Sequence, residues 1–145
     1  MPTRSARTLW AGGLQDGSGQ VELVSSEVGK FDVTFPRRVA DAADGTSPEE
    51  LIGAAHSSCY SMALSAEIAN AGGTPESLDV TADVTLGPDP AGGFRISKIK
   101  LTVRAVAAGL DAEGFSAAAT AAKNGCPVSK ALAGVAEIEL DAALI

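Results

Sequence analysis

The sequence is poor in aromatic side chains, in histidine and in cysteine. Of its 145 residues only 4% are aromatic, one is histidine and two are cysteine. Two cysteines cannot build the disulfide framework of a small secreted domain, and a chain of this length with a hydrophobic share of 46% can bury a core without one. We therefore expect a single domain over residues 1–145, with a core of small aliphatic side chains.

Basic residues and long apolar runs are also scarce. Lys and Arg number 11 against 18 Asp and Glu, a net charge of −7, which argues against nucleic-acid binding. No apolar run reaches the ~18 residues of a membrane span, and the N-terminal arginines have no apolar stretch behind them to form a signal peptide. These features predict a cytoplasmic protein that binds neither nucleic acid nor membrane. Cysteines there are more often catalytic, redox-active or buried than disulfide-bonded.

Hydrophobic periodicity divides the chain into strand-like and helical segments. Alternation of polar and apolar residues predicts strands at 20–24, 30–35, 78–86, 94–106 and 137–144. Between Ile96 and Ile99 the apolar residues change from one face of the expected strand to the other, which predicts a bulge there. Capping residues and breakers predict helices at 47–70, 111–123 and 126–134, with a loop at 37–45. Strands joined as hairpins and separated by helices predict an α+β fold with an antiparallel sheet.

The two cysteines are the residues best suited to chemistry, and their settings differ. Cys126 is predicted at a helix N-terminus, where the dipole and free N–H groups lower the pKa of a thiol. Cys59 is predicted in the middle of a helix so poor in charge that it is expected to be buried on most sides, which raises the pKa of a thiol. A reactive Cys59 therefore needs a cation from elsewhere. Without one, either cysteine is more simply a small buried hydrophobic residue.

The single histidine, His56, has two interpretations. It precedes Cys59 by three residues, which places both on one helix face, as in a Cys–His nucleophile pair. A histidine hydrogen-bonded within the helix packing is the simpler explanation. His56, Cys59 and Cys126 lack the spacing of a zinc site, and the glycine-rich turns lack the setting of a nucleotide-binding loop. We expect no metal and no cofactor.

Two long motifs surround the cysteines. The first is TSPEELIGAAHSSCYSMAL at 46–64, and the second is KNGCPVSK at 123–130. Both resemble the OsmC/Ohr family, the osmotically inducible protein C and organic hydroperoxide resistance proteins, and the resemblance extends from about Trp10 to the C-terminus. The segment PEELIGAAH is more similar to the OsmC branch. The resemblance implies an OsmC-like fold, in which antiparallel β-sheets wrap around long central helices in an intertwined homodimer.

The resemblance also implies a thiol-dependent peroxidase of the oxidative or osmotic stress response. By position, Cys59 matches the peroxidatic cysteine and Cys126 the resolving cysteine. Glu49 matches the glutamate that holds the activating arginine. The family's arginine falls within the segment FPRR, where we favour Arg38 over Arg37.

These roles predict a reaction and its partners. The Cys59 thiolate attacks an organic hydroperoxide, releases an alcohol and becomes a sulfenic acid, with which Cys126 condenses to a disulfide. A dithiol reductant, such as a lipoyl protein, a thioredoxin-like protein or a low-molecular-weight thiol, then restores both thiols. We expect a site lined by Ala, Met and Ile to favour organic hydroperoxides over hydrogen peroxide.

Helix geometry adds a constraint. Glu49 and Cys59 are ten residues apart on one predicted helix, about 15 Å along its axis and about 80° apart around it. One arginine does not span that separation, so we expect the Arg38–Glu49 pair to serve Cys59 of a second subunit. Two alternatives remain: a thiol hydrolase that uses Cys59 and His56, and a non-catalytic stress or ligand-binding protein on the same fold.

Overall fold

The computed structural model describes residues 1–145 and divides into two compact units, Met1–Leu51 and Ile52–Ile145. Each unit is described by itself. The expectation of a single domain stays a prediction. None of the helices combines the length and the apolarity that a membrane crossing needs.

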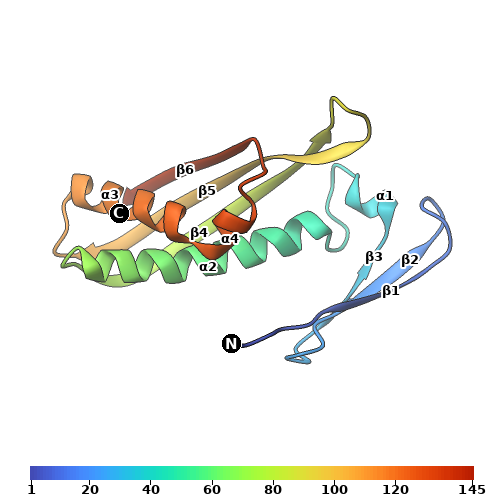
Figure 1. Ribbon diagram of the computed structural model, residues 1–145, viewed down its shortest axis with the longest axis horizontal. Helices are drawn as coiled ribbons and strands as arrows, with labels where there is room; N and C mark the ends of the chain where they lie inside the picture. Colours follow the sequence, from blue (N-terminus) through green and yellow to red (C-terminus); the bar gives the residue numbers. More distant parts are fainter. The chain divides into compact units, whose positions relative to one another are not determined.

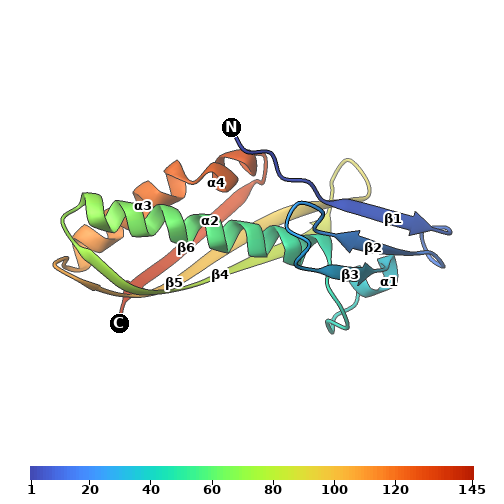
Figure 2. The same ribbon diagram turned by 90° about the horizontal axis from the view of Figure 1, so that it is seen from below.

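The first unit contains a three-stranded antiparallel sheet and a short helix. Strands β1 (Arg7–Ala11), β2 (Ser18–Glu22) and β3 (Lys30–Val33) pair in that order (Figure 2). The sequence predicted β2 and β3 but missed β1, whose side chains are all exposed and so carry no alternation of burial. It also assigned residues 37 and 38 to a loop, whereas they close helix α1 (Phe35–Arg38). Four residues are too few for helical periodicity to show in a sequence.

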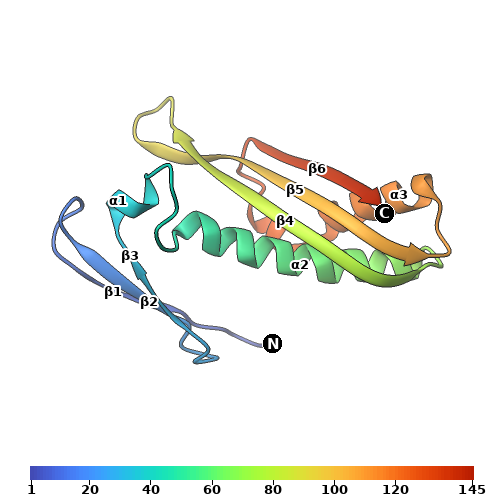
Figure 3. The ribbon, with the colours of Figure 1, turned by 180° about the vertical axis from the view of Figure 1, so that it is seen from behind.

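The second unit packs helices on one face of a three-stranded sheet. Strands β4 (Thr74–Pro88), β5 (Phe94–Ala108) and β6 (Glu137–Leu144) pair in that order. On one face of this sheet lie α2 (Pro48–Asn70), α3 (Ala112–Gly125) and α4 (Pro127–Ala131), as Figures 1 and 3 show from opposite sides. The predicted bulge is confirmed, because Lys98 pairs with Thr85 but Ile96 pairs with Leu86, so that Ser97 is the extra residue.

The last strand corrects the expectation of a purely antiparallel arrangement. Strand β6 pairs with β5 in parallel, with Ile138 opposite Ile99 and Leu140 opposite Leu101. Helices α3 and α4 lie between the two strands in the chain and return it to the end of the sheet where β5 began. A crossover of this kind makes neighbouring strands parallel, whereas a hairpin makes them antiparallel. The fold class remains α+β, with two small sheets and helices.

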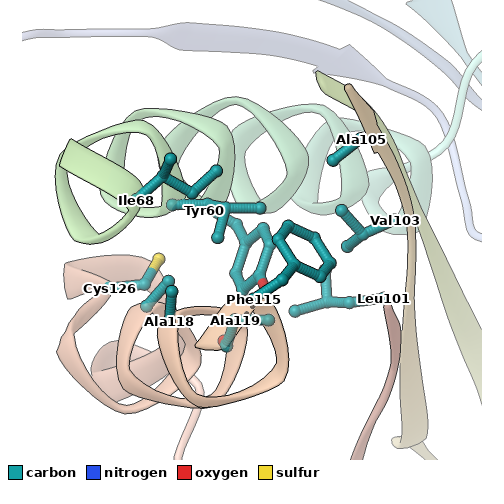
Figure 4. Close-up of a cluster of buried hydrophobic side chains, with 11 residues drawn as sticks. Tyr60, Ile68, Leu101, Val103, Ala105, Phe115, Ala118, Ala119 and Cys126 are labelled. Atoms are coloured by element: carbon teal, nitrogen blue, oxygen red, sulfur yellow. Dashed lines mark hydrogen bonds between the residues drawn. The ribbon is translucent and has the colours of Figure 1, made fainter. Parts of the chain in front are cut away.

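The core of the second unit lies between α2, α3 and β5 (Figure 4). Its fully buried side chains on α2 recur every four residues, at Tyr60, Leu64 and Ile68. They pack with a cluster from β5 and α3 that comprises Leu101, Val103, Ala105, Phe115, Ala118, Ala119 and Ala122. The expectation that α2 is buried on most sides is wrong for the single chain, in which Met62 is 74% exposed. An alanine-rich helix has little apolar periodicity, so its sequence does not identify the buried face.

Candidate active site

The two cysteines meet where α2 passes the beginning of α4. The Sγ atoms of Cys59 and Cys126 lie 3.3 Å apart, and both residues are free thiols. Cys126 is the N-cap residue of α4, as the sequence predicted, and its sulfur points toward α2 in Figure 4. Because a disulfide bond is about 2.05 Å long, a small movement of one side chain is enough to join the two sulfurs.

Hydrogen bonds at the beginning of α4 give the two thiols different acidities. Burial raises the pKa of Cys126, but the neighbouring Ser129, Cys59 and Val128 outweigh it and leave that pKa below its ordinary value. Burial also raises the pKa of Cys59, and a hydrogen bond from the Val128 N–H does not restore it. These directions agree with the sequence analysis, in which Cys126 favours the thiolate and Cys59 needs a cation.

In the first unit, Arg38 of α1 and Glu49 of α2 form an ion pair with several hydrogen bonds. Arg38 Nη2 donates to Glu49 Oε1 at 2.7 Å, and Arg38 Nε donates to both carboxylate oxygens at 3.1 and 3.2 Å. Glu49 is only 7% exposed. Burial alone raises the pKa of Glu49, but the hydrogen bond from Arg38 and the neighbouring backbone lower it below its ordinary value. The carboxylate is therefore ionised near neutral pH and fixes the orientation of the guanidinium.

The neighbouring arginine has a different setting. Arg37 Nε lies 3.9 Å from Asp44 Oδ2, and both side chains are exposed. The side chain of Thr34 caps α1 by accepting a hydrogen bond from the Arg37 N–H at 3.3 Å. Of the two candidate arginines, Arg38 is therefore the one that contacts Glu49. The four residues predicted for the site form two pairs, one in each unit.

An apolar pocket of about 450 Å³ lies beside Arg38 within the first unit. Strands β1 to β3, α1 and the first turn of α2 supply its lining, which comprises Thr8, Trp10, Leu14, Val21, Val33, Thr34, Phe35, Arg38, Pro48 and Leu51. This lining differs from the Ala, Met and Ile residues expected from the sequence. The contribution of Thr8 and Trp10 was missed together with β1, because that strand shows no periodic burial.

The single histidine is fully buried in the second unit. Its Nε2 lies 2.7 Å from the Ser129 hydroxyl oxygen, and its Nδ1 has no hydrogen-bond partner. Burial lowers the pKa of His56, so the ring is neutral. The interpretation of His56 as a buried, hydrogen-bonded histidine is confirmed, whereas the Cys59–His56 nucleophile pair lacks its hydrogen bond.

Ser129 is a site residue that the sequence analysis missed. It lies three positions after Cys126, its hydroxyl contacts His56 at 2.7 Å, and its presence helps to lower the pKa of Cys126. No local pattern in the sequence identifies it, because its partner His56 is 73 positions away.

The sequence of this chain is similar to one protein family and to named bacterial proteins. Residues 41–141 match the family described as OsmC-like protein. The peroxiredoxin OsmC of Escherichia coli (strain K12) is 45% identical over 138 residues, which cover 95% of this chain and 94% of that protein. The organic hydroperoxide resistance protein OhrB of Bacillus subtilis (strain 168) is 29% identical over 126 residues, 85% of this chain and 90% of that protein.

Solved structures show the same fold. The crystal structure of an organic hydroperoxide resistance protein from Elizabethkingia anophelis superposes with a TM-score of 0.81 at 28% identity, and it covers 100% of this chain and 98% of that one. The crystal structure of OhrB of Bacillus subtilis superposes with a TM-score of 0.75 at 28% identity, over 96% and 98% of the two chains.

Proposed function

The chain belongs to the OsmC-like protein family, on its OsmC branch, and we propose that it is a thiol-dependent peroxidase that reduces organic hydroperoxides to alcohols. Its relatives are named peroxiredoxin and organic hydroperoxide resistance proteins, so a peroxidase-type function is supported for the family. The observation that carries the proposal for this chain is the 3.3 Å contact between the sulfurs of Cys59 and Cys126.

Cys59 is the sulfur that attacks the peroxide. Cys126 is completely buried, whereas Cys59 is partly exposed, so the oxidant reaches Cys59 first. Its thiolate forms a bond to the distal peroxide oxygen, and the O–O bond breaks. The alkoxide takes up a proton and leaves as an alcohol, while Cys59 is oxidised to a sulfenic acid.

Cys126 then resolves the sulfenic acid. Its sulfur attacks Cys59 Sγ, the S–O bond breaks, and the departing hydroxide takes up the proton that Cys126 gives up, so that one water is released. The product is a Cys59–Cys126 disulfide, and the contact between the two sulfurs supports this pairing. An external dithiol returns the disulfide to two thiols by exchange and is itself oxidised.

Arg38 supplies the cation that Cys59 lacks. Burial raises the pKa of Cys59, and a guanidinium nearby counters this effect because it stabilises the thiolate. Arg38 is suited to the task since Glu49 fixes its geometry through two carboxylate oxygens. Glu49 and Cys59 are ten residues apart on α2, about 15 Å along the helix axis. We therefore assign this arginine to Cys59 of the partner in a homodimer.

The apolar pocket beside Arg38 gives the proposal its substrate class. Hydrogen peroxide gains little from an apolar wall, whereas the alkyl or aryl group of an organic hydroperoxide gains free energy when it leaves water. Trp10, Phe35 and Leu51 provide such a wall next to the guanidinium. The peroxide group lies at the charged end of the pocket, and the organic group lies along its apolar lining.

A turnover assay tests the proposed function. Reduced protein is mixed with cumene hydroperoxide and a dithiol, and peroxide loss is followed. We expect turnover by the wild type and none by Cys59→Ser. Absence of turnover by the wild type, or unchanged turnover by Cys59→Ser, contradicts the proposal. Cys59-dependent hydrolysis of an ester without peroxide loss favours the thiol hydrolase instead.

A further inference from the structure

Two polar side-chain contacts join α2 to α4 and its N-cap residue. His56 Nε2 lies 2.7 Å from the Ser129 hydroxyl oxygen, and the sulfurs of Cys59 and Cys126 lie 3.3 Å apart. His56 and Cys126 are fully buried, and Ser129 is 7% exposed. The peroxidase steps use the two cysteines but assign no role to His56 or Ser129.

The two contacts have the same spacing on both segments. His56 precedes Cys59 by three residues on α2, and Cys126 precedes Ser129 by three residues at the beginning of α4. Residues three apart share one face of a helix and lie about 4.5 Å apart along its axis. Because 56 pairs with 129 and 59 pairs with 126, the two segments run antiparallel where they meet. A correct distance at one pair therefore supports a correct distance at the other.

The position of Cys126 depends on how α4 is held. Cys126 ends α3, where its N–H donates to the Ala122 carbonyl at 2.8 Å, and it begins α4, where its carbonyl accepts from the Lys130 N–H at 3.0 Å. Helix α3 is held by its own buried side chains. Helix α4 has five residues, too few to be stable alone, and Ser129 is its one buried residue. The contact between Ser129 and His56 therefore holds the part of the chain that follows Cys126.

The hydrogen bond is the stronger of the two contacts in the reduced protein. A thiol is a weak donor and a weak acceptor, whereas a hydroxyl and an imidazole nitrogen form an ordinary hydrogen bond. His56 Nδ1 is buried without a partner, so this one bond is what offsets the cost of burying the polar atoms of the ring. An apolar side chain would fill the same space without that cost, but it would not define a single position for α4 as a hydrogen bond does.

We propose that His56 and Ser129 form a clamp that holds Cys126 against Cys59 before the disulfide forms. Both are positioning residues, which act by keeping α4 on α2. The inference rests on the proposed function, because the resolving step is the one that needs the two sulfurs together. Without the clamp, α4 leaves α2 for part of the time, and the effective concentration of Cys126 at Cys59 falls.

A thiol–disulfide equilibrium tests the clamp without peroxide. Oxidised glutathione converts the two thiols to the Cys59–Cys126 disulfide and is itself reduced to two molecules of glutathione. The equilibrium constant, measured by thiol alkylation and mass spectrometry, reports how favourably the protein brings the two sulfurs together. We expect Ser129→Ala and His56→Phe each to lower this constant about tenfold, because each removes the same hydrogen bond. An equilibrium constant for Ser129→Ala equal to that of the wild type overturns the proposal.

Three further variants separate the clamp from a general loss of structure. Ser129→Thr keeps the hydroxyl and is expected to keep most of the wild-type equilibrium constant. The double variant of His56→Phe and Ser129→Ala is expected to fall no further than either single variant, because the second substitution finds the bond already broken. The exposed Ser116→Ala is the matched control and is expected to leave the constant unchanged. A Ser129→Thr constant as low as that of Ser129→Ala, or additive effects in the double variant, overturns the clamp. If His56→Phe does not fold, the comparison of Ser129→Ala with Ser129→Thr decides.

Single-turnover kinetics relates the clamp to the proposed function. After one equivalent of cumene hydroperoxide, Ser129→Ala is expected to form the sulfenic acid at the wild-type rate but the disulfide about tenfold more slowly. Equal disulfide rates for Ser129→Ala and the wild type overturn the clamp. A wild type that forms no sulfenic acid overturns the peroxidase function alone, and the glutathione equilibrium then still decides the clamp.

Discussion

Cys59 combines an accessible sulfur with an unfavourable acidity, and this conflict defines what the site requires. Burial raises the pKa of Cys59, while Cys126 is the more acidic thiol but is fully buried. In the isolated chain, Cys59 is therefore the sulfur that a peroxide can reach, whereas Cys126 is the sulfur that ionises more readily. A guanidinium beside Cys59 resolves the conflict, and Arg38 is the arginine whose geometry a carboxylate fixes.

The Arg38–Glu49 pair predicts a pH-dependent stability. The pKa of Glu49 is lowered from 4.5 in the folded chain, so the ion pair stabilises fully above that value, and its contribution is lost as the pH falls through the folded-state pKa. We expect Glu49→Gln to be about 1 kcal/mol less stable than wild type at neutral pH and to approach wild type in acid. Urea unfolding at several pH values measures the difference.

The neighbouring glutamate gives a matched control for this experiment. Glu50 is exposed and adjoins Glu49 in the first turn of α2. We expect the difference in free energy of unfolding between Glu50→Gln and the wild type not to shrink in this way as the pH falls. A difference between wild type and Glu49→Gln that stays constant from neutral to acid pH contradicts the role given to the ion pair.

Among the elements, those with strong periodicity or clear caps were predictable from the sequence. Asp111 caps α3 as predicted, its carboxylate accepting from the Gly114 N–H at 2.8 Å, and the wet and dry faces of β4 alternate as predicted. Strand β1 and the four-residue α1 were not, because neither shows periodic burial. The parallel pairing of β6 was also missed, since sequence alternation identifies a strand but not its direction.

The residues of the candidate site were likewise only partly predictable from the sequence. The motifs placed both cysteines, Glu49 and an arginine, whereas the choice of Arg38 over Arg37 rested on position in the chain. The contact between Ser129 and His56 escaped notice because serine is common and the two residues are 73 positions apart. Long-range contacts of this kind are set by packing, which local pattern does not reveal.

Close packing between α2 and β4 predicts an unusual effect of a small substitution. A Cβ at Gly53 would lie 2.9 Å from the Ala82 carbonyl oxygen. Replacing glycine by alanine inside a helix that nothing obstructs stabilises the helix by about 1 kcal/mol. At Gly53, however, the added methyl group forces α2 away from β4. We expect Gly53→Ala to destabilise the protein by about 1–3 kcal/mol, measured by thermal unfolding.

The control for this substitution lies on the same helix. Ala55 is exposed, so Ala55→Gly is expected to cost about 1 kcal/mol through helix propensity alone. A higher melting temperature for Gly53→Ala than for the wild type contradicts the account of close packing.

For the whole molecule, the central prediction is an active site shared by two subunits. Arg38→Ala and Cys59→Ser are each expected to be inactive, but refolded together they should recover activity. A mixed dimer joins an intact Arg38 from one chain with an intact Cys59 from the other, which gives one working site. An equal mixture should therefore reach about a quarter of wild-type peroxide turnover, since half of the dimers are mixed and each has one site of two.

The control for the mixing experiment is Arg37→Ala. This variant is expected to be active by itself, because Arg37 contacts Asp44 rather than Glu49. If the mixture of Arg38→Ala and Cys59→Ser stays inactive, Arg38 does not act across a subunit interface.

The identity of the attacking sulfur is the claim on which the account depends most. Cys126→Ser removes the resolving thiol, so a sulfenic acid formed at the other cysteine persists long enough to be trapped. The measurement is mass spectrometry after one equivalent of cumene hydroperoxide and a sulfenic-acid-specific dimedone probe. The account predicts a single label on Cys59 in Cys126→Ser and none on Cys59→Ser. An unlabelled Cys59, or a label on Cys126 in Cys59→Ser, would contradict it.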